Sequence, residues 1–175
     1  MKTYIGTDPG RSGHIVCLNP DNSTTKFAIP KVGGQVDVHA LNKIFSQFTK
    51  IEHHIVTEDL HAIFGSAASS TFSFGWINGI LEGLLVANHL SFTKVQPKVW
   101  QKEMFQGTPE IRKPSKINSK GIPTKGRLDT KAMSILTAKR LFPNFSLLPS
   151  ERCRKDDDGI ADSILMAEYC RRHFK

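Results

Sequence analysis

The sequence predicts one α/β domain in which a five-stranded mixed β-sheet is flanked by helices. Its 175 residues correspond to a single domain covering residues 1–175. The first 30 residues contain three short β-type runs separated by turn residues, as in an antiparallel meander. Two further β-type runs then alternate with helical patterns, and a long helical pattern closes the chain. Such an order indicates a sheet with both parallel and antiparallel neighbours.

The predicted strands are short runs rich in β-branched and aromatic residues, each ended by turn residues. The first ends at Asp8, because Pro9 favours an extended conformation in the residue before it and Pro9-Gly10 marks a turn. The segment Asn19-Pro20-Asp21-Asn22 separates the second strand from the third. The five predicted strands are residues 3–8, 14–18, 24–29, 54–58 and 92–95.

The predicted helices have apolar residues at spacings of three and four. Pro97 suits the first turn of a helix, Asp129 or Thr130 caps another, and Pro143 marks where that helix ends. The predicted helices are residues 36–49, about 71–88, 97–105, about 130–141 and about 157–173.

Residues 106–128 differ from the rest of the chain in composition. They contain repeated Gly and Pro with almost no aliphatic periodicity, which predicts a long surface loop, and such loops usually carry function. From residue 110 to 131, seven Lys and Arg stand against two acids, a net charge of +5 over 22 positions. A solvated loop would explain these charges, but we favour contact with a DNA backbone. The predicted DNA-binding residues of the loop are Arg112, Lys113, Lys116, Lys120, Lys125 and Arg127.

The net charge of the whole chain favours an acidic partner. It is +8, which indicates nucleic acid or an anionic surface. The most apolar helical stretch, residues 72–87, is interrupted by polar residues and is shorter than the ~20 residues that a bilayer requires, so no membrane span is expected. The N-terminus shows neither signal-peptide nor transit-peptide features, and the three cysteines form no disulfide framework. We therefore expect a cytoplasmic location.

Four acidic residues are placed where chemistry is expected. Asp8 and Glu58 each end a predicted strand, and Asp158 and Asp162 lie four residues apart on the last predicted helix. If that helix crosses the ends of two neighbouring strands, the four carboxylates meet where α/β sheets commonly bind ligands. Clustered carboxylates repel unless cations neutralise them, and an all-oxygen shell suits Mg²⁺ or Mn²⁺. Two such ions would support phosphodiester hydrolysis by an activated water.

Most of these acids also have a simpler interpretation. Asp8 before Pro9-Gly10 suits a turn, Glu58 suits a solvated strand end, and the run of residues 156–158 suits a helix N-terminus. Asp162 lies past the first turn among apolar residues, where an unpaired carboxylate is costly. Apart from the four acids, Lys and Arg exceed Asp and Glu by 12. An acidic pocket in a basic surface is the distribution expected of a metal-dependent nuclease.

Three segments resemble the acidic motifs of the RuvC-type Holliday junction resolvases. They are YIGTDPG at 4–10, TEDLHA at 57–62 and DDGIADS at 157–163. The segments SSTFSFG at 69–75, VQPKVWQK at 95–102, and DTKA at 129–132 before RLFP at 140–143 also have counterparts in the phage and chloroplast branch of that family. The resemblance spans almost the whole chain in order. It implies a ribonuclease-H-like fold, a homodimer, and paired symmetric nicks in four-way DNA junctions.

The resemblance also implies roles for individual residues. Lys131 matches a basic residue near the scissile phosphate. The cofactor implied is Mg²⁺ or Mn²⁺, two ions per site, and the location is the host cytoplasm if the protein is phage-encoded. The matched metal-binding and catalytic acids are Asp8, Glu58, Asp158 and Asp162.

The chain departs from the family pattern at two positions. Asp157 stands where many relatives have His before the third acid, so Asp157 is an alternative or additional ligand to Asp158. Gln101 stands where relatives often have Lys after the Trp, which leaves Lys102 as the candidate for DNA contact.

The helix predicted at 71–88 carries two further features. Phe72 and Phe74 either contact bases at an open junction or anchor the helix in the core, and Phe74 is the preferred wedge between bases. Gly75, Gly79 and Gly83 expose backbone along one face, although each glycine costs ~1 kcal/mol relative to Ala. Close packing on the protein's own sheet explains this spacing, and the family resemblance implies a two-fold dimer contact along this helix as the alternative.

We therefore expect a metal-dependent, structure-selective DNA endonuclease that resolves four-way junctions and leaves 5′-phosphates. The alternative enzyme is a ribonuclease-H-fold nuclease acting on flaps, branched DNA or RNA–DNA hybrids. The non-enzymatic alternative is a basic junction-binding module. An actin-like ATPase also has a strand ending in Asp before a Gly, but that architecture needs two such domains, and 175 residues are too few.

Overall fold

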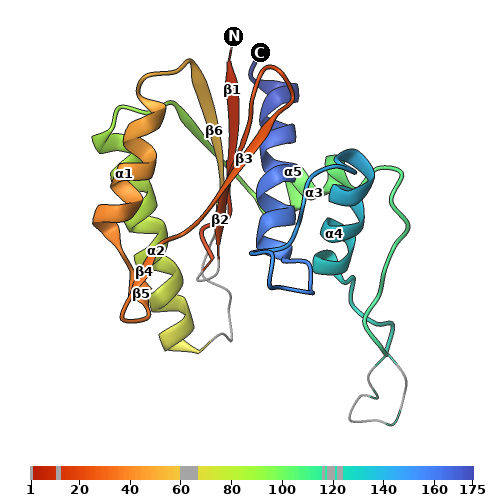
Figure 1. Ribbon diagram of the computed structural model, residues 1–175. Helices are drawn as coiled ribbons and strands as arrows, with labels where there is room; N and C mark the ends of the chain where they lie inside the picture. Colours follow the sequence, from red (N-terminus) through yellow and green to blue (C-terminus); the bar gives the residue numbers. More distant parts are fainter. Residues whose placement is uncertain (1, 11–12, 60–66, 116, 118–120, 122–123) are drawn as a thin grey trace.

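The computed structural model describes residues 2–10, 13–59, 67–115, 117, 121 and 124–175. These residues form a five-stranded sheet in the order β3-β2-β1-β6-β7, with helices on both faces (Figure 1). The sheet is mixed, because its first three strands pair antiparallel and the remaining neighbours pair parallel. The predicted fold class is confirmed.

Strands β1 (Thr3–Thr7), β2 (His14–Leu18) and β3 (Thr24–Ala28) form the predicted meander. β6 (His53–Glu58) lies parallel to β1, with Thr57 opposite Thr7. β7 (Phe92–Val95) lies parallel to β6, with Val95 opposite Glu58. Since β1, β6 and β7 run in one direction, their carboxyl ends lie at one edge of the sheet.

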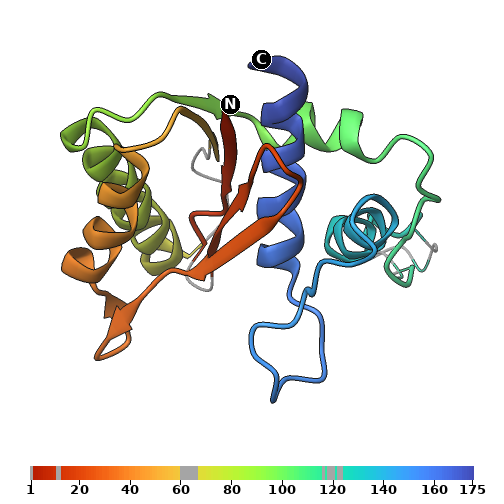
Figure 2. The ribbon, with the colours of Figure 1, turned by 45° about the horizontal axis from the view of Figure 1, so that its top comes forward.

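The helices form a layer on each face of the sheet. α1 (Val38–Phe48) and α2 (Ala68–Ala87) cover one face, and α5 (Asp158–His173) packs on the other, with α3 (Pro97–Met104) and α4 (Thr130–Leu141) beside it (Figures 1 and 2). Each layer encloses its own apolar core, one containing Leu41 and Leu81, the other containing Val56 and Ile164. The sheet is therefore buried on both faces, as expected when helices cover both sides.

Helix α5 approaches β1 closely because Gly6 has no side chain. A Cβ at Gly6 would lie 2.0 Å from the backbone oxygen of Ser163 and 2.5 Å from the nitrogen of Ala167. The Ser163 hydroxyl lies 2.8 Å from the backbone oxygen of His14 and accepts a hydrogen bond from the backbone N–H of Asp8 at 3.2 Å. These contacts fix the first turns of α5 against the end of β1.

Two local features differ from the predictions. α2 begins at Ala68, ahead of the predicted start near residue 71, so its serines lie within the first turn. A small hairpin of β4 (Lys31–Val32) and β5 (Gln35–Val36) precedes α1 and was not predicted. Its two-residue turn, Gly33-Gly34, has φ angles of +56° and +79°, which glycine adopts readily. Val36, predicted as the start of a helix, belongs to β5, and α1 begins at Val38 after its N-cap Asp37.

The segment predicted as a long surface loop is partly paired. Arg112 forms an antiparallel bridge with Leu128, and the N–H of Lys113 donates to the oxygen of Arg127 at 2.9 Å. A Cβ at Gly126 would lie 1.8 Å from the oxygen of Lys113, so this approach requires glycine. The two arms of the predicted surface loop are therefore paired where they leave the domain, which the sequence did not predict, and form a short ribbon there.

None of the described helices is both long enough and apolar enough to cross a bilayer.

Candidate active site

The candidate site lies at the carboxyl edge of the sheet, at the end of the molecule opposite to both termini (Figure 1). Asp8 follows β1 directly, and Glu58 is the last residue of β6. Asp158 and Asp162 lie on the first turns of α5, which Gly6 and Ser163 hold against β1. The charge of Asp8 acts on both Glu58 and Asp162. The structure thus brings together the four acids that the sequence singled out.

Asp8 combines a turn interaction with a half-buried, desolvated carboxylate. Its Oδ1 accepts a hydrogen bond from the N–H of Gly10 at 2.9 Å, as the simpler turn interpretation expects. Burial nevertheless raises the pKa of Asp8 to about 6, although the Gly10 hydrogen bond lowers it, and the charges of Asp158 and Asp157 add to the rise. A residue serving only a surface turn would not be desolvated in this way.

Glu58 is held by a tryptophan from the neighbouring helix. The indole N–H of Trp100 donates to Glu58 Oε1 at 3.1 Å. Burial raises the pKa of Glu58 to about 7, the charge of Asp8 raises it further, and the Trp100 hydrogen bond opposes the rise. The solvated strand end considered for Glu58 is therefore not observed.

Asp162 has the least compensated carboxylate. Its Oδ1 is buried and has no hydrogen-bond partner among the described residues. Burial raises the pKa of Asp162 well above its usual range, and the charges of Asp8 and Glu58 add to the rise. The hydroxyl of Ser134 opposes this rise, although it forms no hydrogen bond of good geometry with Asp162. A buried acceptor in this state is costly unless a cation or a donor satisfies it.

Lys131, on the first turn of α4, supplies a positive charge to the cluster. Its Nζ lies 2.5 Å from Asp158 Oδ2, and its side chain is 67 % exposed. The pKa of Lys131 is raised, first by the hydrogen bond with Asp158 and further by the charges of Asp158, Asp162 and Asp8. An exposed ammonium group beside the acids is well placed to meet an anionic substrate.

The three consecutive aspartates have different contacts. Asp156 pairs with Lys139 at 2.6 Å. Asp157 is the N-cap of α5, because its Oδ1 accepts from the N–H of Ile160 at 3.1 Å. The same oxygen lies 3.6 Å from His14 Nδ1. The helix-terminus interpretation therefore holds for Asp157 as the N-cap and for Asp158 in the first turn, whereas Asp156 precedes the helix. Of the three, only Asp158 also contacts Lys131.

The donor set suits a hard cation, although it is not preassembled. Within the described part of the chain, no three His, Cys, Asp or Glu side chains are already arranged as a metal site. The acids nevertheless supply only oxygen atoms, which Mg²⁺ and Mn²⁺ prefer. The unpartnered buried oxygen of Asp162 is the feature that a cation would satisfy. The ligand atoms that these four acids offer therefore suit Mg²⁺ or Mn²⁺.

The ribbon formed by the two arms extends from the same end of the molecule (Figure 1), and its sequence is rich in basic residues. Lys113, Lys125 and Arg127 are exposed, whereas Arg112 is tied to Glu110 at 2.7 Å and to the oxygen of Gly126. The predicted residues Lys116 and Lys120 lie outside the described part of the chain.

Lys102, predicted as a substitute for a family lysine, is exposed in the last turn of α3. It contacts none of the four acids in the described structure. Its assignment to DNA contact therefore rests on the sequence resemblance alone.

Helix α2 presents an apolar outer face to solvent. Phe72 is 74 % exposed and Phe74 is 48 % exposed, so neither anchors the helix in the core, and that alternative is wrong. Gly75, Gly79 and Gly83 have no described atom within 4 Å of where a Cβ would lie. Close packing on the protein's own sheet is therefore also wrong for these glycines within the described structure.

Sequence reasoning missed the contacts that hold the acids in place. Trp100 was noted only within a motif, and Gly6 and Ser163 only as parts of the acidic motifs. Pro97 could have indicated the position of Trp100. A proline favours the first turn of a helix, and residue 100 then lies about one turn later, on the face of α3 that packs toward the sheet. No local pattern pairs Gly6 with Ser163.

No protein-family model matches the sequence, and no curated protein matches it. One solved structure similar to this chain is T. thermophilus RuvC in complex with Holliday junction substrate. The two chains share 11% sequence identity and superpose with a TM-score of 0.56. The alignment covers 98% of this chain and 96% of that chain. This likeness shows a RuvC-like, ribonuclease-H-like fold, as predicted. The assignment to the phage and chloroplast branch stays a prediction.

Proposed function

We propose that the protein is a Mg²⁺- or Mn²⁺-dependent DNA endonuclease that resolves four-way junctions by paired nicks and leaves 5′-phosphates. The observation that carries this proposal is the convergence of carboxylates from three separate segments, with one buried oxygen of Asp162 unpartnered in the described structure. The fold supports it, because the similar RuvC structure is a complex with Holliday junction substrate.

The acids provide the place for the cations. Asp8, Glu58, Asp158 and Asp162 would ligate them, whereas Asp157 stays at the helix cap that it already forms. Two bound cations would supply Lewis-acid activation of a water and of the scissile phosphate. Charge neutralisation would draw the carboxylates closer together than in the metal-free arrangement, where burial and repulsion already raise the pKa of three of them.

Lys131 is proposed to bind the substrate. It is exposed and pairs with Asp158 through a single contact. When Asp158 ligates a cation, the ammonium group is free to donate to a non-bridging oxygen of the phosphate. Lys131 would thus exchange the Asp158 carboxylate for the phosphate as its partner. Its ammonium group would then donate a hydrogen bond where negative charge increases in the transition state.

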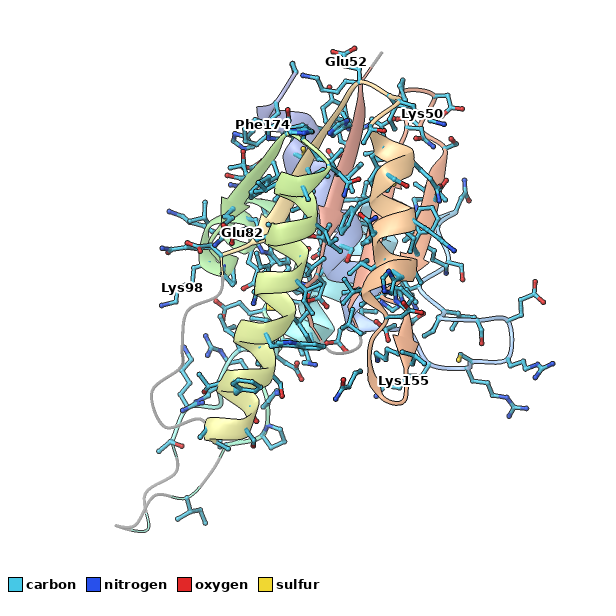
Figure 3. All side chains as sticks on the ribbon, turned by 90° about the vertical axis from the view of Figure 1, so that its left-hand side faces the viewer. Lys50, Glu52, Glu82, Lys98, Lys155 and Phe174 are labelled. Carbon is cyan, nitrogen blue, oxygen red and sulfur yellow. The ribbon has the colours of Figure 1, made fainter. Side chains whose placement is uncertain are left out.

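A dimer is proposed on the outer face of α2, with a second copy of this chain as the occupant. Each copy would supply the same glycine-lined face, on which Phe72 and Trp76 are also exposed. Figure 3 views the molecule from the side on which α2 lies. The three glycines lower helix propensity with no steric need inside the described monomer, and close approach of a second helix gives them one. A two-fold axis would relate two acidic sites, as paired nicking requires.

The test is cleavage of synthetic DNA by the full chain with Mg²⁺, Mn²⁺ or Ca²⁺. Labelled four-way junctions, flaps and RNA–DNA hybrids of matched sequence are compared at two salt concentrations. We expect symmetric paired nicks in the four-way junction with Mg²⁺ or Mn²⁺, and binding without turnover with Ca²⁺, which tolerates looser geometry. Binding should weaken steeply with salt, because basic side chains release counterions from DNA.

Two other results of this test would assign a different function to the protein. Preferential cutting of flaps or hybrids would make the protein another nuclease of this fold. Junction binding without cutting in the presence of any divalent ion would make it a binding module, and would remove the acids from catalysis.

A further inference from the structure

Trp100 is a fully buried residue in direct contact with a proposed metal ligand. Its side chain has 0% exposure, and its indole N–H donates to Glu58 Oε1 at 3.1 Å. The ring packs edge-to-face on Phe105, with centroids 6.1 Å apart, and lies in the core enclosed by α5. The indole therefore has a single fixed position, and its only donor is used on the carboxylate.

The local fold explains how this contact arises. Glu58, the last residue of β6, is paired with Val95, the last residue of β7. α3 begins two residues later at Pro97, after the N-cap Gln96. Trp100 then follows after one helical turn, on the face that returns to the sheet. The distance along the chain from Val95 to Trp100 thus sets where the donor meets Glu58.

We propose that Trp100 is a positioning residue for Glu58: its N–H fixes Oε1, so that Oε2 is presented to the cation. Oε2 has no hydrogen bond among the described residues. The proposal rests on the metal-dependent function above and adds a group that touches neither metal nor DNA. Residues that orient metal ligands in this way typically change metal affinity 10–100-fold when they are lost, so about tenfold is expected here.

The chemistry of indole suits this task better than that of other donors. Indole N–H is a donor only, so it cannot compete with Glu58 as a ligand. It is neutral, so it leaves the negative charge of the carboxylate available to the cation, which a Lys or Arg would neutralise. Because Trp100 is fully buried, water cannot replace its hydrogen bond without opening the core.

The experiment measures Mn²⁺ affinity directly, by electron paramagnetic resonance titration of free Mn²⁺ in the absence of DNA. The variants are Trp100→Phe, Glu58→Gln and the double variant. A matched control, Phe105→Leu, alters the packing on the indole and removes no donor. We expect Trp100→Phe to raise the Mn²⁺ Kd by about tenfold, the control to change it by less than about twofold, and Trp100→Phe to have almost no further effect in Glu58→Gln.

A second substitution keeps the test valid if Trp100→Phe does not fold. Incorporation of 3-benzothienylalanine at position 100 replaces only the indole N–H by sulfur and preserves the ring shape. It should raise the Kd by the same factor as Trp100→Phe.

The possible failures are distinguishable. A parent protein that binds no Mn²⁺ would overturn both the proposed function and this inference. A parent that binds Mn²⁺, together with a folded position-100 variant of equal affinity, would overturn only the positioning role. Equal losses in the position-100 variant and in Phe105→Leu would also overturn it, because they would show that packing alone matters.

Discussion

The two longest helices lie on opposite faces of the same sheet and use their residues in opposite ways. α5 has 16 residues, of which 11 are buried, and it carries the half-buried acids Asp158 and Asp162 on its first two turns. α2 has 20 residues, of which only Ile77, Leu81 and Leu85 are buried, and its outer face is glycine and aromatic. α5 thus brings charge into the protein, and α2 leaves apolar surface in solvent.

Neither arrangement stabilises the folded monomer in the absence of metal ions. Buried carboxylates without cations reduce stability, and a glycine-rich exposed face reduces helix stability without any packing in return. Both costs agree with the proposed function, in which cations bind the acids of α5 and a second copy of this chain covers the outer face of α2. Substitutions on α5 and on α2 separate these two requirements.

The largest expected effect comes from neutralising an acid on α5. Asp162→Asn should lower the junction cleavage rate by about a thousandfold or more, because several kcal/mol of metal-dependent transition-state stabilisation are lost. Junction affinity measured by fluorescence anisotropy in Ca²⁺ should change little. The matched control is Asp156→Asn on the segment before α5, which removes only the pair with Lys139. If the two variants cut equally well, Asp162 has no role in catalysis.

The next effect concerns stability without metal. Burial raises the pKa of Asp8 from its ordinary 3.8 to about 6, so the folded state binds more protons than the unfolded state between these values, and stability falls as pH rises through them. Asp8→Asn removes this titration and should be more stable than the parent at pH 7.5 in EDTA by up to roughly 3 kcal/mol.

Chemical unfolding of both proteins at several pH values measures this difference. The two stabilities should converge below about pH 3, where the Asp8 carboxyl is protonated in both the folded and the unfolded parent. Added Mg²⁺ should stabilise the parent selectively at pH 7.5. A parent that is already as stable as Asp8→Asn in EDTA at pH 7.5 would show that the carboxylate is not destabilising.

The third effect falls on α2. Gly79→Leu should weaken dimerisation by about a hundredfold or more, because a bulky side chain from each copy enters a close helix contact. The monomer should still fold, since a Cβ at Gly79 meets no described atom within 4 Å. Analytical ultracentrifugation together with thermal unfolding checks both statements. A folded variant that is fully dimeric at the parent's concentration range would exclude this face as the interface.

The smallest expected effects are changes in the free energy of unfolding when single glycines on opposite faces of the sheet are replaced by alanine. Gly6→Ala, under α5, should destabilise the fold by about 2 kcal/mol, because the new methyl overlaps the backbone of Ser163. Gly79→Ala, on the open face of α2, should instead stabilise the monomer by about 0.5–1 kcal/mol. Urea unfolding under monomeric conditions measures both. Equal changes at the two positions would contradict the described packing of α5 on β1.

Much of the fold is predictable from local sequence signals. Pro9, Pro97 and Pro143 mark element boundaries correctly. Runs of β-branched and aromatic residues bounded by turns locate the strands of the five-stranded sheet, and apolar spacings of three and four locate the five helices of the described residues. The β4–β5 hairpin was missed although Gly33-Gly34 is a known turn signal, because its strands have only two residues each.

The candidate site is predictable in composition but not in detail. The order of the acids along the chain, together with the family resemblance, identified Asp8, Glu58, Asp158 and Asp162. The separate contacts of Asp157 and Asp158 depend on tertiary geometry, as does the bond from Trp100 to Glu58. Desolvation, which raises the pKa of these acids, is a property of the packed core and is absent from any local pattern.

Under the proposed function, side chains from the end of β1, from β6 and from α5 ligate the same cations. Anomalous diffraction of Mn²⁺ in crystals of the protein grown or soaked with MnCl₂ locates those cations directly. We expect Mn²⁺ peaks contacting Asp8, Glu58 and Asp162, with Asp158 released from Lys131. Mn²⁺ bound elsewhere, or a site between these side chains that stays empty at saturating Mn²⁺, would contradict it.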